Sequence, residues 1–149
     1  MPLTEVNRTI INYRFDGPEE GTVVMLSNAL ASDLTMWDMQ IPALVEAGYR
    51  VLRYDSRGHG QSAVPEGPYS IELLVKDAVG LMDKLGLEKV QFCGLSMGKM
   101  VGQMLATHYC RVRLSMSHDS DLAGLEYAVF AVTSVFMGFC EVINVALKK

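Results

Sequence analysis

The chain has 149 residues, enough for one domain with a hydrophobic core, and half of them are apolar while one fifth are charged. This composition is typical of a globular protein, and the formal net charge of -4 without a lysine or arginine cluster argues against nucleic acid as a partner. The three cysteines, Cys93, Cys110 and Cys140, show no metal-binding spacing, and their odd number predicts free thiols in a reducing compartment. The N-terminus lacks the basic and apolar regions of a secretion signal, so we expect a cytoplasmic location.

The first third of the chain is predicted to contain strands around one helix. Residues 7–15 are expected to form one or two short strands. Residues 22–27 are a continuous apolar run, which is typical of a strand covered on both faces, as in a parallel sheet. A helix is predicted from about residue 36 to residue 47, ended by Gly48. Pro42 lies within it, so this helix either starts late or is kinked.

The alternation of strands and helices then continues. Residues 49–54 are predicted to be a strand, and residues 55–62 a glycine-containing loop. Ser70 is a suitable N-cap for a helix over residues 71–85, and the apolar run 90–93 forms the next strand. Strand and helix therefore alternate four times, which predicts an α/β fold with a mostly parallel sheet and right-handed crossovers.

The stretch Gly94-Leu95-Ser96-Met97-Gly98 joins this last strand to a helical pattern. Between a strand and a helix, Gly-x-Ser-x-Gly is typical of a nucleophile elbow, a strained turn that raises a serine hydroxyl above the C-terminal edge of a parallel sheet. Any side chain at 94 or 98 is expected to crowd this turn against the neighbouring strand and helix. The alternative is a Ser/Gly turn that only joins a strand to a helix.

Three motifs in order resemble the α/β-hydrolase fold family, in particular the 3-oxoadipate enol-lactone hydrolases. The motifs are Ser27-Asn28-Ala29-Leu30 with Trp37, Arg53-Tyr54-Asp55-Ser56-Arg57-Gly58-His59-Gly60-Gln61-Ser62, and Phe92-Cys93-Gly94-Leu95-Ser96-Met97-Gly98. The resemblance covers residues 8–120 and implies an α/β-hydrolase-type mostly parallel sheet with flanking helices. The chain departs from the family at Ala31 and Lys99, where the family usually has glycine.

The resemblance implies hydrolysis of a carboxylic ester or lactone by acyl transfer, without cofactor or metal. Ser96 is the implied nucleophile. The backbone N–H of Met97 is expected to stabilise the oxyanion, and by analogy with the family the loop at Leu30 supplies the second donor. We expect Asp55, Arg57 and Ser62 to fix their loop rather than to act on the substrate, and Trp37 to form a pocket wall or core.

A serine nucleophile needs a base, normally a histidine held by a carboxylate, and none of the three histidines is identified as that base. His108 lies twelve residues beyond Ser96 on the same predicted helix, roughly 18 Å away at the usual rise, which is too far. His59 is implied to shape its loop. His118 precedes Asp119, but adjacent strand residues point to opposite faces. Asp119 is the candidate catalytic acid, with a polar loop residue as its alternative.

The resemblance stops after about Ser120, where the family continues with a cap, further strands, an acid and a histidine. We therefore predict a partial α/β-hydrolase domain at 1–120, truncated after about the sixth strand, and a divergent apolar tail at 121–149. Between residues 122 and 140 the tail carries one charge, Glu126, as a membrane helix could, although polar residues within and after it argue against insertion. If the tail does not enter a membrane, we expect it to pack over the exposed sheet edge. A further alternative is that its sequence results from an unspliced intron or a frameshift.

Two hypotheses for the function follow. The first is a serine hydrolase acting on a small-molecule ester or lactone. The second is a non-catalytic truncated hydrolase remnant or interaction module that lacks the catalytic histidine. An exposed strand edge favours pairing with a partner, so an oligomer through that edge is a further expectation.

Overall fold

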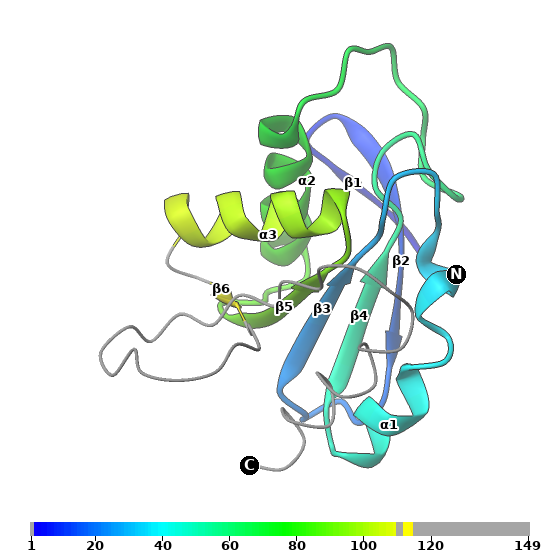
Figure 1. Ribbon diagram of the computed structural model, residues 1–149, viewed down its shortest axis with the longest axis vertical. Helices are drawn as coiled ribbons and strands as arrows, with labels where there is room; N and C mark the ends of the chain where they lie inside the picture. The colour runs from blue at the N-terminus through cyan, green and yellow to red at the C-terminus, as the bar shows by residue number, and fades with distance from the viewer. Residues whose placement is uncertain (1, 110–111, 115–149) are drawn as a thin grey trace.

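The structure, a computed structural model, describes residues 2–109 and 112–114 (Figure 1). Six strands of this part of the chain form one sheet in the order β1-β2-β4-β3-β5-β6. The strands are β1 (Leu3–Val6), β2 (Thr9–Asp16), β3 (Val23–Ser27), β4 (Arg50–Tyr54), β5 (Val90–Gly94) and β6 (Val112–Leu114). The helical segments are the 3-10 helix η1 (Leu34–Trp37) and the helices α1 (Ile41–Glu46), α2 (Ile71–Lys84) and α3 (Met97–His108).

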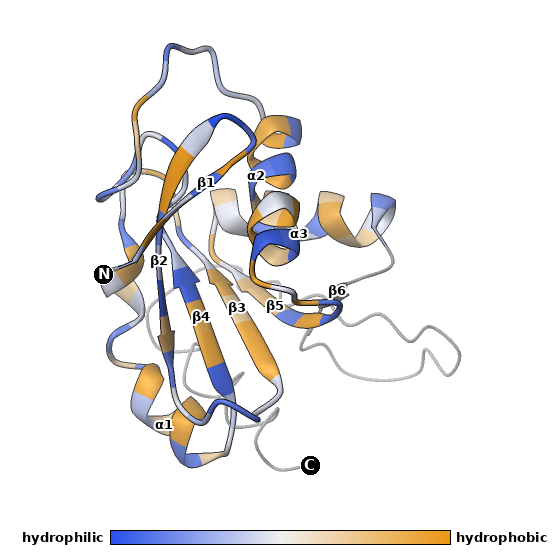
Figure 2. Cartoon of the chain, turned by 180° about the vertical axis from the view of Figure 1, so that it is seen from behind, coloured by the Kyte–Doolittle hydropathy of each residue, from blue (hydrophilic) through white to orange (hydrophobic). Residues whose placement is uncertain are grey.

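The sheet is mostly parallel. β3 pairs in parallel with β4 and with β5, and β5 pairs in parallel with β6, whereas β1 and β2 extend the β4 side in antiparallel pairs. All five residues of β3 are buried, which explains the continuous apolar run in the sequence and the orange colour along much of β3 in Figure 2. The predicted α/β fold with a mostly parallel sheet and flanking helices is confirmed.

Alternate residues of β3 point into two cores, one on each face of the sheet. Met25 belongs to the larger core, which α2 and α3 complete with side chains such as Leu81 and Val101. Leu26 belongs to the second core, together with Trp37 of η1 and a buried leucine of α1. Helices therefore cover both faces of the sheet, and Figure 1 shows α1 well apart from the pair α2 and α3.

The N-terminal strands begin earlier than predicted. The expected strand region at 7–15 corresponds to β2, and β1 precedes it. Asn7 and Arg8 join the two strands with φ values of 45° and 59°, the backbone of a two-residue hairpin turn. β1 has no apolar alternation because Val6 is its one buried residue, and this is why the sequence pattern did not reveal the strand.

The helix predicted at 36–47 is divided in two. η1 begins after Asp33, whose carboxylate accepts a hydrogen bond from the Thr35 N–H at 2.8 Å. Pro42 lies in the first turn of α1, where a missing N–H removes no helical hydrogen bond. The late start that Pro42 predicted is confirmed, and Gly48, at φ 85°, ends the helix as expected.

Within the described part of the chain, no helix is both long enough and apolar enough to cross a membrane. The predicted tail at 121–149, its boundary at residue 120, and the candidates His118 and Asp119 fall outside the residues that the structure describes.

Candidate active site

Ser96 lies in the sharp turn between β5 and α3, at the C-terminal edge of the sheet. Its φ of 52° and ψ of -111° are outside the regions that non-glycine residues usually populate. Backbone strain of this kind costs of order 1–3 kcal/mol. The Ser96 side chain is exposed and makes no capping hydrogen bond to α3. The turn therefore holds a solvent-facing hydroxyl on a strained backbone, which is the geometry of a nucleophile elbow.

Gly94 and Gly98 allow this turn to pack directly on neighbouring backbone. A Cβ atom on Gly98 would overlap the carbonyl group of Ser27, at the end of β3. A Cβ atom on Gly94 would overlap the backbone of Gly98 itself. Both glycines are buried, and the prediction that any side chain would crowd the serine turn is confirmed.

Backbone hydrogen bonds join the elbow to the loop that follows β3. The Leu95 N–H donates to the carbonyl oxygen of Ser27 at 3.2 Å, and the Gly98 N–H donates to that of Asn28 at 3.1 Å. Ser27 also faces Gly94 in the parallel pairing of β3 with β5. The two strands thus end at the same level, and the chain segments that follow them leave the sheet side by side.

Several backbone N–H groups of these segments donate to no other described residue, and those of Met97 and Leu30 are among them. Met97 is the first residue of α3, so its N–H has no acceptor within the helix. Leu30, in the loop after β3, has a similarly unbonded N–H among residues 2–109, and its side chain is 68% exposed. Because the N-terminus of the 12-residue helix α3 carries a partial positive charge, this edge of the sheet favours a negatively charged group.

Asn28 is fully buried where the loop leaves β3. Its Oδ1 accepts a hydrogen bond from the Trp37 Nε1–H at 2.8 Å, and its Nδ2 donates to the carbonyl oxygen of Tyr54 at 3.0 Å. Trp37 is 1% exposed and packs in the second core, so its predicted role as core is confirmed. The sequence shows Asn28 only as part of the motif at residues 27–30, and its place directly after a buried strand is the one signal of this role.

The rest of this loop is held by weaker contacts. The Ser32 hydroxyl donates to the Ala29 carbonyl at 2.7 Å, and the Ala29 N–H lies 3.5 Å from the Met36 sulfur, a weak acceptor. Ala31 has a φ of 59°, in the left-handed region that favours glycine. This conformation explains why glycine suits the position in the family.

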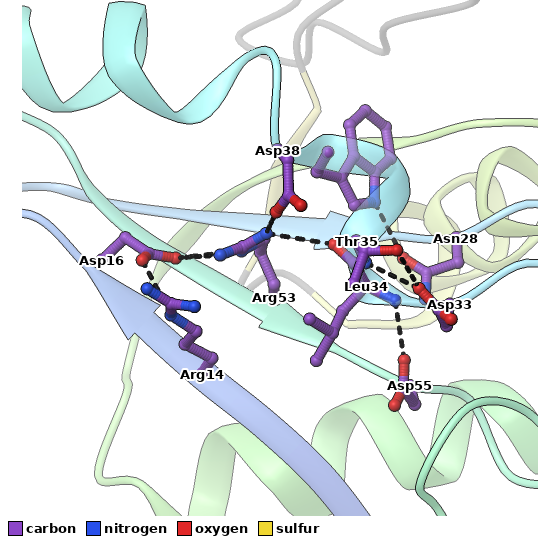
Figure 3. A network of polar contacts seen from close by, with 10 residues as sticks. Arg14, Asp16, Asn28, Asp33, Leu34, Thr35, Asp38, Arg53 and Asp55 are labelled. Atoms are coloured by element: carbon purple, nitrogen blue, oxygen red, sulfur yellow. Dashed lines mark hydrogen bonds and ion pairs between the residues drawn. The ribbon is translucent and has the colours of Figure 1, made fainter. Parts of the chain in front are cut away.

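The loop after β4 is organised around the carboxylate of Asp55. This carboxylate accepts hydrogen bonds from the Leu34 N–H at 2.7 Å, the Gln61 N–H at 2.9 Å and the Asn12 amide at 2.8 Å, the first of which is drawn in Figure 3. The Ser62 hydroxyl donates to the Asp55 carbonyl at 2.7 Å. The expectation that Asp55 and Ser62 fix this loop is confirmed.

Two buried arginines form further ion pairs. Arg53 pairs with Asp16 at 2.8 Å and also with Asp38 (Figure 3). Arg57 pairs with Asp77 of α2, and both side chains are buried. The hydrogen bonds that the Arg57 guanidinium donates to the Asp77 carboxylate raise the pKa of Arg57 above its ordinary value. Arg57 therefore has the structural role that was expected, through a partner that the sequence did not reveal.

No histidine in the described part of the chain hydrogen-bonds to Ser96. The Nδ1 of His59 lies 3.1 Å from the carbonyl oxygen of Arg57, within its own loop. His108 is the last residue of α3, at the end of the helix opposite Ser96. The elbow is thus present without a base among these residues, and the role of His118 stays untested.

Cys93 is the cysteine nearest the elbow, on β5. Burial raises the pKa of its thiol to about 12. The thiol therefore stays protonated near neutral pH and does not compete with Ser96 as a nucleophile. Among residues 2–109, no three histidine, cysteine, aspartate or glutamate side chains gather as they would around a metal ion.

Comparison with known proteins agrees with this geometry. Residues 22–118 match the family model described as alpha/beta hydrolase fold. The chain is 42% identical over 99 residues to 3-oxoadipate enol-lactonase 2 of Acinetobacter baylyi, an alignment that covers 66% of this chain and 37% of that enzyme. It is 38% identical over 91 residues to bifunctional epoxide hydrolase 2 of Sus scrofa, with coverage of 60% and 16%.

The fold also matches solved structures. The crystal structure of the enol-lactonase from Burkholderia xenovorans LB400 aligns with a TM-score of 0.73 at 47% identity, over 75% of this chain and 44% of that one. The chain thus spans less than half the length of each of these relatives. The resemblance seen in the sequence motifs is confirmed, and the chain belongs to the alpha/beta hydrolase fold family.

Proposed function

We propose that the protein is a hydrolase that cleaves a carboxylic ester or lactone by acyl transfer through Ser96. The observation that carries the proposal is the Ser96 turn, where an exposed hydroxyl on a strained backbone precedes the Met97 N–H, which meets no acceptor within residues 2–109 and 112–114. Relatives named as enol-lactonases support a lactone as the substrate class. The proposed substrate is a small molecule, and the reaction uses no cofactor.

In the proposed mechanism, Ser96 Oγ attacks the carbonyl carbon while a base removes the hydroxyl proton. The carbonyl oxygen becomes an oxyanion, which accepts hydrogen bonds from the N–H groups of Met97 and Leu30. The tetrahedral intermediate then collapses, the carbon–oxygen bond to the leaving group breaks, and the leaving oxygen receives the proton. Water attacks the resulting acyl-enzyme in the same way, which releases the acid and restores Ser96.

The base is proposed to come from outside the described residues. Neither histidine of the described residues suits this role. His59 is bonded within its own loop, and His108 lies at the end of α3 distant from Ser96. Asp119 stays the candidate for the carboxylate that orients the base. A reducing compartment, the cytoplasm, is proposed as the setting because Cys93 is a free thiol.

The rival hypothesis is a non-catalytic protein that binds a partner and has no base. Hydrolysis of p-nitrophenyl acetate and of an enol-lactone by the full chain separates the two hypotheses. We expect Ser96→Ala to lower the rate at least ~10³-fold, because the reacting oxygen is lost. The rival predicts the same background rate for the wild type and this variant.

Ser70 offers a matched control, since it is also an exposed serine at the N-cap of a helix. Its hydroxyl accepts a hydrogen bond from the Leu73 N–H at 3.3 Å. Ser70→Ala is expected to lower the stability by about 1 kcal/mol and to leave the rate per folded molecule unchanged. A rate loss in Ser70→Ala equal to that in Ser96→Ala would contradict a specific role for Ser96.

A further inference from the structure

Asn28 connects four parts of the fold through three hydrogen bonds. Besides its side-chain bonds to Trp37 of η1 and to the carbonyl of Tyr54 at the end of β4, its own carbonyl accepts the Gly98 N–H of α3 at 3.1 Å. The side chain is completely buried, and its amide oxygen and one of its two amide N–H groups are hydrogen-bonded. Asn28 therefore fixes the end of β3 relative to β4, η1 and the elbow at the same time.

The two N–H groups proposed to bind the oxyanion lie on either side of this junction. Leu30 follows Asn28 by two residues, and Met97 directly precedes Gly98, the residue bonded to the Asn28 carbonyl. A shift of Asn28 therefore changes the separation of these two donors. We propose that Asn28 is a positioning residue, which sets the distance between the Leu30 and Met97 N–H groups through its buried side chain.

Few other contacts in the loop could take over this role. Between Asn28 and η1, the Ser32 hydroxyl donates to the Ala29 carbonyl at 2.7 Å, the Ala29 N–H reaches only a weak sulfur acceptor at 3.5 Å, and Leu30 is largely exposed. The bond from Trp37 to Asn28 ties the far end of this loop to its beginning. The start of η1 keeps its bond from the Leu34 N–H to Asp55 at 2.7 Å, so loss of the Asn28 side chain would chiefly release the beginning of the loop, next to Leu30.

The inference rests on the proposed function, because positioning matters only if an oxyanion binds there. Two readouts in the full chain keep the two claims separate. The first is the split between kcat and KM for ester hydrolysis. The second needs no activity and follows the ¹⁵N–¹H resonances of the Leu30 and Met97 amides.

We expect Asn28→Ala to lower kcat roughly 10²-fold, the size of losing one oxyanion donor, with KM changed less than about threefold. The Leu30 and Met97 amide resonances are expected to shift in this variant. Asn28→Ser places no charge in the buried site, and its short hydroxyl cannot bond both Trp37 and the Tyr54 carbonyl. Its kcat is therefore expected to fall between those of the wild type and Asn28→Ala, and it covers the case in which Asn28→Ala does not fold.

Asn12 is the matched control, since it is equally buried and donates to Asp55 at 2.8 Å in the loop after β4. Asn12→Ala is expected to lose stability like Asn28→Ala, while kcat per folded molecule and the Leu30 and Met97 resonances stay close to the wild type. Equal kcat losses in the two alanine variants, or unchanged Leu30 and Met97 resonances in both Asn28 variants, would overturn the inference. If the wild type hydrolyses no ester, the proposed function fails, and the amide resonances still decide whether Asn28 positions the two donors.

Discussion

The loop after β4 and the turn after β5 lie at the same edge of the sheet, but their polar groups differ in how far they are hydrogen-bonded within the protein. In the loop after β4, the Asp55 carboxylate accepts three hydrogen bonds, and Arg57 is paired with the buried Asp77. In the turn after β5, the Ser96 hydroxyl faces solvent and the Met97 N–H meets no acceptor among the described residues. Buried groups that satisfy one another stabilise a fold, whereas exposed and unbonded groups are available to a ligand. This difference supports the proposal that the turn after β5, rather than the loop that contains His59, is the place for chemistry.

The largest effect on stability is expected from the first of these loops. Asp77→Ala leaves the Arg57 guanidinium buried without its carboxylate partner. We expect the free energy of unfolding to fall by about 3–5 kcal/mol in urea denaturation. The exposed Lys76, on the same helix, is the control. We expect Lys76→Ala to change the free energy of unfolding by no more than about 0.5 kcal/mol. A loss below about 1 kcal/mol for Asp77→Ala would show that the pair contributes little.

The second expected effect concerns the contact between the elbow and the end of β3. In Gly98→Ala the new methyl group meets the Ser27 carbonyl, so α3 must move away from β3 and the bond from Gly98 to Asn28 weakens. We expect a loss of about 1–3 kcal/mol in stability, as for other overpacked sites, together with loss of hydrolysis.

Gly48→Ala is the control for the cost of a left-handed backbone without a steric clash. Gly48 has a φ of 85°, and no atom lies near the position of the added Cβ. We expect this substitution to lower stability by about 1 kcal/mol without changing the rate per folded molecule. If Gly98→Ala behaved like Gly48→Ala in both measurements, close packing of the elbow on β3 would not matter for the site.

The smallest expected effect concerns the strain at Ser96. Ser96→Gly and Ser96→Ala both remove the hydroxyl, but glycine adopts the backbone at φ 52° and ψ -111° more readily than alanine. We expect the free energy of unfolding of the glycine variant to exceed that of the alanine variant by about 1 kcal/mol. Thermal denaturation of the two proteins measures this difference, and a less stable glycine variant would argue that the turn is not strained.

The sequence predicted the elements whose pattern is local. The apolar run of β3, the helical spacing of α2 and the Gly-x-Ser-x-Gly turn depend on neighbours in the chain, so each could be recognised without coordinates. β1 could not, because one buried valine makes no pattern.

The sequence also did not predict which buried polar side chains, far apart in the chain, bond to one another. In the sequence, Asp77 is one polar residue of the helix predicted at 71–85, and Asn28 is one residue of a short motif. Their importance comes from Arg57 and from Trp37 and Tyr54, which only the folded chain brings to them. Sequence periodicity shows which face of an element is buried, but it does not show which buried polar groups pair across elements.

Covalent labelling shows whether Ser96 is the activated nucleophile that we propose. The full chain is incubated with a fluorophosphonate, which phosphonylates activated serine hydroxyls, and the modified peptide is located by mass spectrometry. We expect one adduct, on Ser96, which is absent from Ser96→Ala and retained in Ser70→Ala. An unlabelled Ser96, or an adduct on another serine in its place, would contradict the proposal.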